Sequence, residues 1–311
     1  MDMWFLIGTL SRWALFAGLL VAVGAVAFKL VILRRFPGFE PEEDGAAGVT
    51  PERLAARIGG LAVLLAGAGT LGRLAAEASI FRDPFEPLGA ELRLLVTGTS
   101  WGRAWLGQVA AVVVSGLAFA LAAARGARAE FGWIAATAGV ALLAYTPALA
   151  GHAAGAEHFV TPAITADIFH MVAGGVWLGT LAVMAGVLYL GRRRGASLSK
   201  RRIVDWISAF SPLALGSAAV IAVTGLFAAW LHLGSISALW TEPWGRTLSL
   251  KLFVVLAIAG CGAYNWRRAR GRVGEAEDPP RLPPTVTVEL GAAGLLLLVT
   301  AVLTGTTPPA H

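Results

Sequence analysis

Long apolar segments alternate with short polar connectors along the whole chain. Each apolar segment has about 20 residues or more, the length that an α-helix needs to cross a hydrocarbon core of about 30 Å. The apolar positions do not alternate as they would in a strand, so the pattern predicts helices and not a β-barrel. Eight transmembrane helices are predicted, over residues 4–33, 54–81, 101–124, 131–151, 162–190, 203–232, 247–267 and 285–304.

The connectors between these segments are too short to bury a core of their own. The longest are residues 34–53 and 82–100, and the second is predicted to carry a short amphipathic helix from Pro87 to Val96. The first apolar segment has no basic leading region and no small-residue cleavage site after it, so we expect a retained helix and not a signal peptide. The prediction is a single all-α transmembrane domain over residues 1–311, a polytopic bundle of about eight helices.

The composition supports a membrane protein. Hydrophobic residues make up 57% of the chain and charged residues only 14%, and the mean hydropathy is +0.70. A soluble chain carries roughly 25% charged residues. The low charge content excludes an ordinary soluble domain.

The basic residues are unevenly distributed between the two sets of connectors. Lys and Arg gather after the first, third, fifth and seventh predicted helices, whereas the other connectors carry few of them. By the positive-inside rule the basic connectors face the cytoplasm, which leaves both termini outside. The net charge of +6 follows from this anchoring pattern, so no nucleic-acid partner is expected.

A few charged side chains lie within the predicted helices. Arg73 and Glu77 are four residues apart and are predicted to neutralise each other. Lys251 lies near the outer start of its helix, where a long side chain can extend its ammonium group to the interface.

All five histidines fall on the outer side by the charge argument, and they are the main candidates for chemistry in a chain otherwise poor in reactive groups. The single cysteine, Cys261, excludes a metal site built from a Cys pair. There is no Ser/His/Asp arrangement, no zinc-protease motif and no Walker A loop, so we expect no enzyme and no ATPase. The histidines are His152, His158, His170, His232 and His311.

The segment from Asp167 to Met171 is the most informative part of the chain. Thr161 is predicted to cap the helix, with Pro162 at its first position, which places His170 about 12 Å below the helix start. Asp167 lies three residues before His170 on the same face, so its carboxylate can accept a proton from one ring nitrogen and orient the other toward a metal. A charged residue in hydrocarbon costs about 2.5–3.5 kcal/mol, which indicates a function.

Gly175 and Gly179 continue the same predicted helix. Small residues four apart let a neighbouring helix approach closely, so this helix is expected to be central in the bundle.

The residue types favour copper only slightly over other metals. Imidazole nitrogen suits Zn, Cu, Fe and Ni, whereas the thioether of Met171 suits Cu(I). At His232, beside Trp230, anchoring at the interface competes evenly with metal binding. The candidate ligands are His152, His158, Asp167, His170 and Met171.

Several short motifs in this order resemble the copper-resistance protein D (CopD) family of integral membrane proteins. The resemblance extends over most of the chain and is strongest over residues 150–304. The motifs are Gly151-His152-Ala153, Asp167-Ile168-Phe169-His170 with Val176-Trp177-Leu178-Gly179, Phe210-Ser211-Pro212-Leu213-Ala214 with Val223-Thr224-Gly225-Leu226, Pro243-Trp244-Gly245-Arg246-Thr247-Leu248 before Leu250-Lys251, Asn265, and Val302-Leu303-Thr304-Gly305 with Pro308-Pro309.

This resemblance implies copper binding and transport across the bacterial inner membrane, with uptake from the periplasm as the favoured direction. It also implies a periplasmic copper-binding partner of the CopC type. His152 and His170 match the histidines of the family, and Asp167, Trp177 and Gly179 match the signature of its fifth helix.

Two alternatives remain open from the sequence. A b-type haem electron carrier could use His170 and His232 as axial ligands, because they belong to adjacent predicted helices. The other alternative is a copper relay or sensor that is confined to the outer leaflet and does not transport the ion. Closer to the cytoplasm than Met171, the only sulfur atoms that could bind copper are those of Met184 and Cys261.

Overall fold

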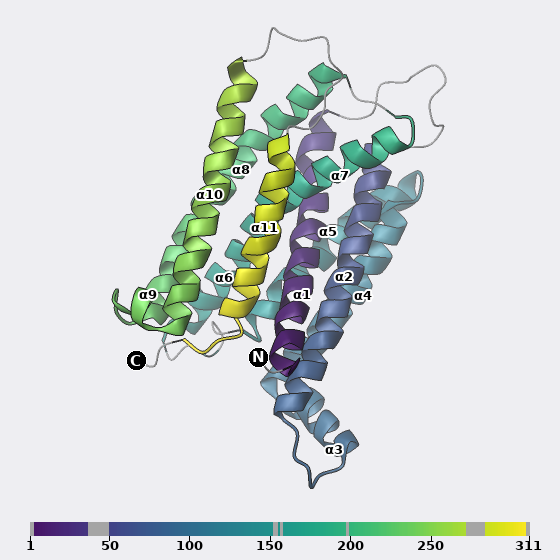
Figure 1. Cartoon of the computed structure of the whole chain (residues 1–311). Coiled ribbons are helices and arrows are strands. Elements are labelled where there is room, and N and C mark those ends of the chain that lie inside the picture. Colours follow the sequence, from purple (N-terminus) through teal and green to yellow (C-terminus); the bar gives the residue numbers. More distant parts are fainter. Residues whose placement is uncertain are drawn as a thin grey trace.

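The computed structural model describes residues 3–36, 50–151, 155, 158–196, 199–271 and 284–308, and all its regular elements are helical (Figure 1). In chain order they are α1 (Met3–Ala27), the π-helical turn η1 (Phe28–Leu33), α2 (Pro51–Ile80), α3 (Leu88–Arg93), the π-helical turn η2 (Leu94–Gly98), α4 (Ser100–Ala122), α5 (Ala127–Ala148), α6 (Val160–Gly174), the π-helical turn η4 (Gly175–Gly179), α7 (Thr180–Arg193), α8 (Lys200–Leu233), α9 (Ala238–Thr241), α10 (Pro243–Gly271) and α11 (Pro284–Leu303).

The described part of the chain contains eight helical spans that are long and apolar enough to cross a membrane, which confirms the all-α prediction. The first span combines α1 with η1, and the fifth combines α6, η4 and α7. The short helix predicted between Pro87 and Val96 corresponds to α3 and η2.

Hydroxyl side chains start three of the helices. Thr50, Thr99 and Ser199 accept hydrogen bonds from the backbone N–H groups three residues later, at 3.2, 2.9 and 3.4 Å. Such caps satisfy backbone donors that have no partner in the first helical turn.

The start of α6 differs from the sequence prediction. Its capping residue is Phe159, in the left-handed region at φ 58°, and Thr161 and Pro162 lie within the first turn. The carbonyl of Thr161 accepts the hydroxyl of Thr165 as part of the helix. The helix therefore begins earlier than predicted, because the chain turns at Phe159 without any side-chain cap.

The first helix is the centre of the bundle. Within its most apolar stretch, 67% of the residues are buried. A methyl group on Gly24 would overlap the carbonyl of Gly179, and one on Gly179 would overlap the carbonyl of Leu20. The close approach predicted at the glycines of the fifth span is thus confirmed, and the neighbour is α1.

The helices α8 and α10 lie at the periphery. Only 6% of the most apolar stretch of α8 and 17% of that of α10 are buried. Trp206 and Ala209 of α8 are buried in the large core, and Trp206 packs edge-on against Phe28 at 5.0 Å between ring centroids. Figure 1 shows α8 and α10 on one side of α1, and α2 and α4 on the other.

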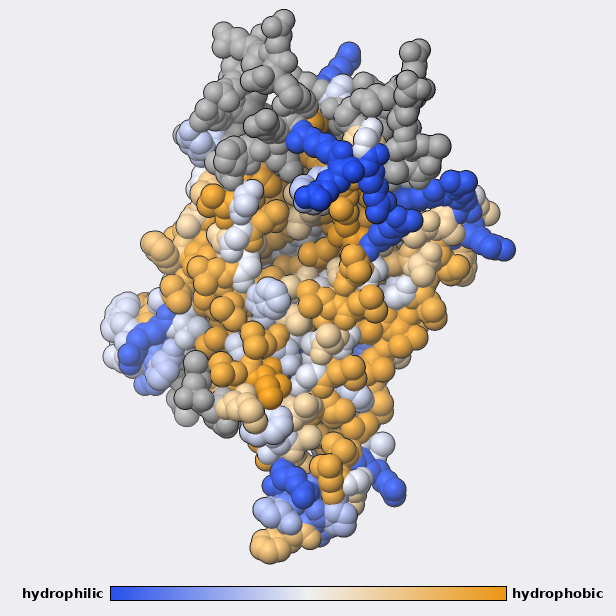
Figure 2. All heavy atoms as spheres, turned by 45° about the vertical axis from the view of Figure 1, so that its right-hand side comes forward, coloured by the Kyte–Doolittle hydropathy of each residue, from blue (hydrophilic) through white to orange (hydrophobic). Residues whose placement is uncertain are grey.

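The start of α1 and the end of α11 lie at the same end of the bundle (Figure 1), as an even number of spans requires. We call this end the N/C end. Figure 2 shows hydrophobic residues over the middle of the molecule and hydrophilic residues at its two ends. Exposed arginines at the opposite end include Arg34, Arg35, Arg192, Arg193, Arg194 and Arg201.

Candidate metal site

Three helices carry a polar side chain at a similar depth from the N/C end. His170 lies ten residues after the start of α6, Thr224 nine residues before the end of α8, and Lys251 eight residues after the start of α10. At 1.5 Å per residue these positions are about 12–15 Å along each helix. A polar layer therefore lies well inside the apolar part of the bundle.

The imidazole of His170 is held by Thr224. The distance from Nδ1 of His170 to Oγ1 of Thr224 is 2.9 Å, and the same hydroxyl donates to the carbonyl of Val220 at 2.7 Å. A threonine hydroxyl has one proton to donate. Because that proton is used on Val220, Nδ1 of His170 carries the hydrogen, and Nε2 keeps the lone pair that a metal requires.

The ring of His170 also lies against the backbone of α8. A methyl group placed on Gly225 would be 3.5 Å from Cε1 of His170, which is ordinary van der Waals contact. The site is therefore formed between α6 and α8.

The carboxylate of Asp167 lies one helical turn before His170 on α6. Nδ1 of His170 is hydrogen-bonded to Thr224 and not to Asp167, so the prediction that Asp167 orients the ring is corrected. Asp167 instead faces the segment after α5, where a methyl group on Gly151 would lie 3.9 Å from Oδ2. His152 is the next residue in sequence and lies outside the described residues.

Lys251 faces the same site and does not extend away from it as predicted. It interacts electrostatically with both Asp167 and His170. Val254 and Ile258 follow it on the same face of α10 and form a buried cluster with Leu178 of η4 and Ala293 of α11. The face of α10 that carries Lys251 is therefore turned toward η4 and α11.

Lys251 and Asp167 do not touch as a direct ion pair. Among the described residues, ion pairs within 4.0 Å join Lys29 to Glu52 and Arg82 to Glu91. The interaction between Lys251 and Asp167 thus acts over a longer distance.

The remaining candidates are dispersed. His158 is exposed just before Phe159, and Met171 packs against the large hydrophobic core one turn after Asp167. The ring of His232 lies 6.3 Å from that of Trp244, near the N/C end of α8. His311 lies outside the described residues.

No group of three or more His, Cys, Asp or Glu side chains comes together within the described ranges. The described site thus supplies Nε2 of His170 and, one turn before it, the carboxylate of Asp167, while Met171 packs against the large hydrophobic core. A nitrogen and an oxygen can bind copper, and further ligands would have to come from beyond the described residues.

Sequence reasoning missed the roles of Thr224 and Lys251. Lys251 carried a usable signal, because a charge eight residues inside an apolar helix is costly unless it has a partner. Thr224 was noted only within the motif Val223-Thr224-Gly225-Leu226, since a threonine in a helix usually bonds its own backbone.

A second polar group lies between α2 and α4. Arg73 donates to Oε1 of Gln108 at 3.3 Å, and Nε2 of Gln108 donates to Thr70 at 2.5 Å. Glu77 interacts electrostatically with Arg73 and with Arg12. Hydrogen bonds therefore link Arg73, Gln108 and Thr70, and this set stabilises the packing of α2 against α4.

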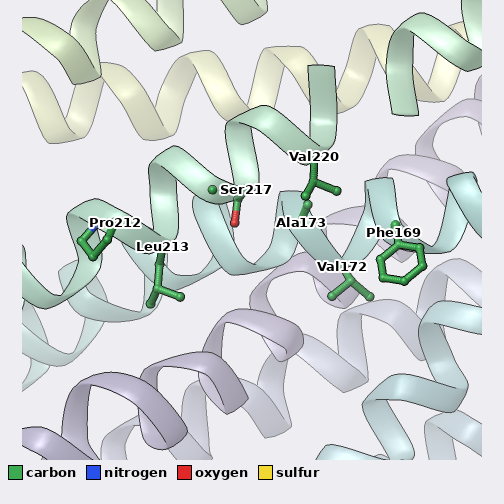
Figure 3. Close-up of a pocket in the computed structure, with 8 residues that line it drawn as sticks. Phe169, Val172, Ala173, Pro212, Leu213, Ser217 and Val220 are labelled. Atoms are coloured by element: carbon green, nitrogen blue, oxygen red, sulfur yellow. The ribbon is translucent and has the colours of Figure 1, made fainter. Parts of the chain in front are cut away.

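A pocket of about 310 Å³ lies between α6 and α8 (Figure 3). Its lining begins at Phe169, the neighbour of His170 in sequence. Its lining has one hydroxyl, from Ser217, and no imidazole, thiol or thioether. The pocket is therefore unsuited to hold a metal. The lining residues are Phe169, Val172, Ala173, Pro212, Leu213, Gly216, Ser217 and Val220.

Two family models match the chain. The model described as copper resistance protein D-like, N-terminal domain, matches residues 1–161, and the model described as copper resistance protein D matches residues 204–303. The helical turn with Asp167 and His170 lies between the two matched stretches.

The copper transport protein CutJ of Bacillus subtilis (strain 168) is 28% identical over 206 residues. The match covers 65% of this chain and 36% of that protein, so the chain spans little more than a third of its relative. No solved structure matches the chain.

Proposed function

Because the chain belongs to the copper resistance protein D family, we propose that it binds copper within the membrane and transports it across. It is a multi-pass membrane protein of a family associated with copper resistance. The observation that carries the proposal is the imidazole of His170, with Nδ1 hydrogen-bonded to Thr224 and Nε2 free to bind a metal.

Copper reaches the site from the N/C end, which the charge pattern of the connectors assigns to the outside of the cell. His152, with the exposed His158 nearby in sequence, captures the ion, and Asp167, His170 and Met171 receive it. The position of Gly151 beside Asp167 supports this order, because His152 follows Gly151 directly. A periplasmic copper-binding protein of the CopC type delivers the ion.

The proposed direction is uptake. The inner half of the route has few groups that could bind copper, because the only polar side chain lining the pocket beyond His170 is the hydroxyl of Ser217. A copper relay or sensor confined to the outer leaflet is therefore the second candidate, and the experiment below separates the two.

The geometry argues against a shared haem. His170 is hydrogen-bonded to Thr224, and His232 lies eight residues further along α8. That separation is about 12 Å along the helix, so the two rings do not face one iron atom.

Substituting His170→Gln tests the function, with His232→Gln as the matched control. Glutamine keeps a polar group beside Thr224 but removes the imidazole. We expect purified H170Q to lose bound copper, and cells that express it to lose copper accumulation, while H232Q retains both.

Each outcome has a distinct meaning. Unchanged copper stoichiometry in H170Q contradicts the site. Lost stoichiometry with unchanged accumulation contradicts transport and favours the relay or sensor. Thermal unfolding of each purified variant shows whether the fold is kept.

A further inference from the structure

We propose that Lys251 is a fixed positive charge that makes the copper site select monovalent over divalent cations. This inference rests on the proposed function and extends it to the valence of the transported ion.

The position of Lys251 is set by helix packing. Val254 and Ile258 bury the same face of α10 against Leu178 of η4 and Ala293 of α11, so Lys251 lies on the inner face of α10, which is turned toward η4 and α11. Its side chain also starts at about the same depth as Asp167 and His170. The ammonium group is thus held near the site by the bundle and not by a direct ion pair.

The charges of the site nearly cancel. When Asp167 is ionised and Lys251 is protonated, their opposite charges attract each other across the site. With a neutral imidazole at His170, an arriving cation meets almost no net charge. A site without net charge gives a divalent ion no electrostatic advantage over a monovalent one.

Removing the positive charge would change this balance in a way that depends on valence. The Coulomb energy between an ion and a fixed charge is proportional to the charge of the ion. The fold-change in affinity for a divalent ion is therefore the square of that for a monovalent ion. A gain of about tenfold for Cu(I) on loss of Lys251 corresponds to a gain of about a hundredfold for Zn²⁺.

The test compares Cu(I) and Zn²⁺ binding to the purified full-length protein, with Cu(I) kept reduced and both affinities measured by competition with a chelator. Lys251→Met is expected to strengthen Zn²⁺ binding far more than Cu(I) binding. Lys251→Arg keeps the charge and is expected to keep the wild-type ratio. Lys29→Met, which removes a lysine paired with Glu52 at the opposite end, is the matched control.

A second variant tests the charge balance itself. Asp167→Asn leaves the charge of Lys251 uncompensated, so Cu(I) binding falls. The double variant D167N/K251M is neutral again and regains much of this loss. A purely structural role for Lys251 predicts additive losses instead.

The outcomes separate this inference from the proposed function. If H170Q binds copper as the wild type does, the site itself is wrong. If H170Q loses copper but K251M keeps the wild-type ratio of affinities, only the role of Lys251 is wrong. Lys251→Gln replaces K251M if the methionine variant fails to fold.

Discussion

Nδ1 of His170 in α6 lies 2.9 Å from the hydroxyl of Thr224 in α8, and this contact joins a well-packed span to a peripheral one. The same hydroxyl is bonded to the carbonyl of Val220, which determines the direction of the hydrogen bond. Nε2 of His170 is therefore left with its lone pair because Thr224, on another helix, accepts the hydrogen of Nδ1.

Thr224→Val should weaken Cu(I) binding about tenfold, because groups that orient a metal-binding histidine contribute on that order. Valine keeps the shape of threonine but cannot accept the proton on Nδ1. Competition with a chelator measures the affinity. Thr224→Ser should restore most of the binding.

Thr165→Val is the control for this experiment, since its exposed hydroxyl bonds only the carbonyl of Thr161 in the same helix. Equal affinities for T224V and T165V would show that the bond to His170 does not orient a ligand.

Gly179→Ala should lower the melting temperature of the purified protein. The added methyl group would overlap the carbonyl of Leu20, and overpacking of this kind typically costs about 1–3 kcal/mol. Gly260→Ala is the matched control, because a methyl group added there on α10 would meet no atom within 4 Å. A melting temperature for G179A equal to that of G260A would contradict the close contact between α1 and η4.

Cysteine labelling can determine the orientation in the membrane. In a Cys261→Ala background, Phe85→Cys places a thiol in the connector between α2 and α3, where Phe85 is 95% exposed. Ala127→Cys places one at the exposed start of α5, at the opposite end. A membrane-impermeant maleimide added to intact cells should label only the first. The reverse pattern would place the N/C end in the cytoplasm.

Gln108→Leu should lower stability without changing copper affinity. The amide is 1% exposed and links Arg73 to Thr70, so its loss leaves buried polar groups unpaired at a cost of about 1–3 kcal/mol. Thermal unfolding and copper titration check the two parts. Thr97→Ala, an exposed position bonded only within its own turn, should change neither. A loss of copper binding in Q108L would show that the second polar group belongs to the metal site.

The helices could be predicted from the sequence because their length and apolar character are local properties. The start of α6 could not, since Phe159 adopts a left-handed conformation that no residue pattern indicates. Asp167 and His170 were predicted as site residues because charged and imidazole groups are rare within a membrane span. Thr224 and Lys251 were missed because their roles depend on helices more than fifty residues away meeting at one depth.

The helices that form the candidate metal site differ in how deeply they are buried in the bundle. His170 belongs to a span clamped against α1 through Gly24 and Gly179, whereas Thr224 and Lys251 belong to α8 and α10, which have few buried residues. A rigid-body shift of this outer pair would move Thr224 away from His170 and Lys251 away from Asp167 in one step. Under the proposed function, the affinity of the site for copper would therefore depend on the docking of α8 and α10.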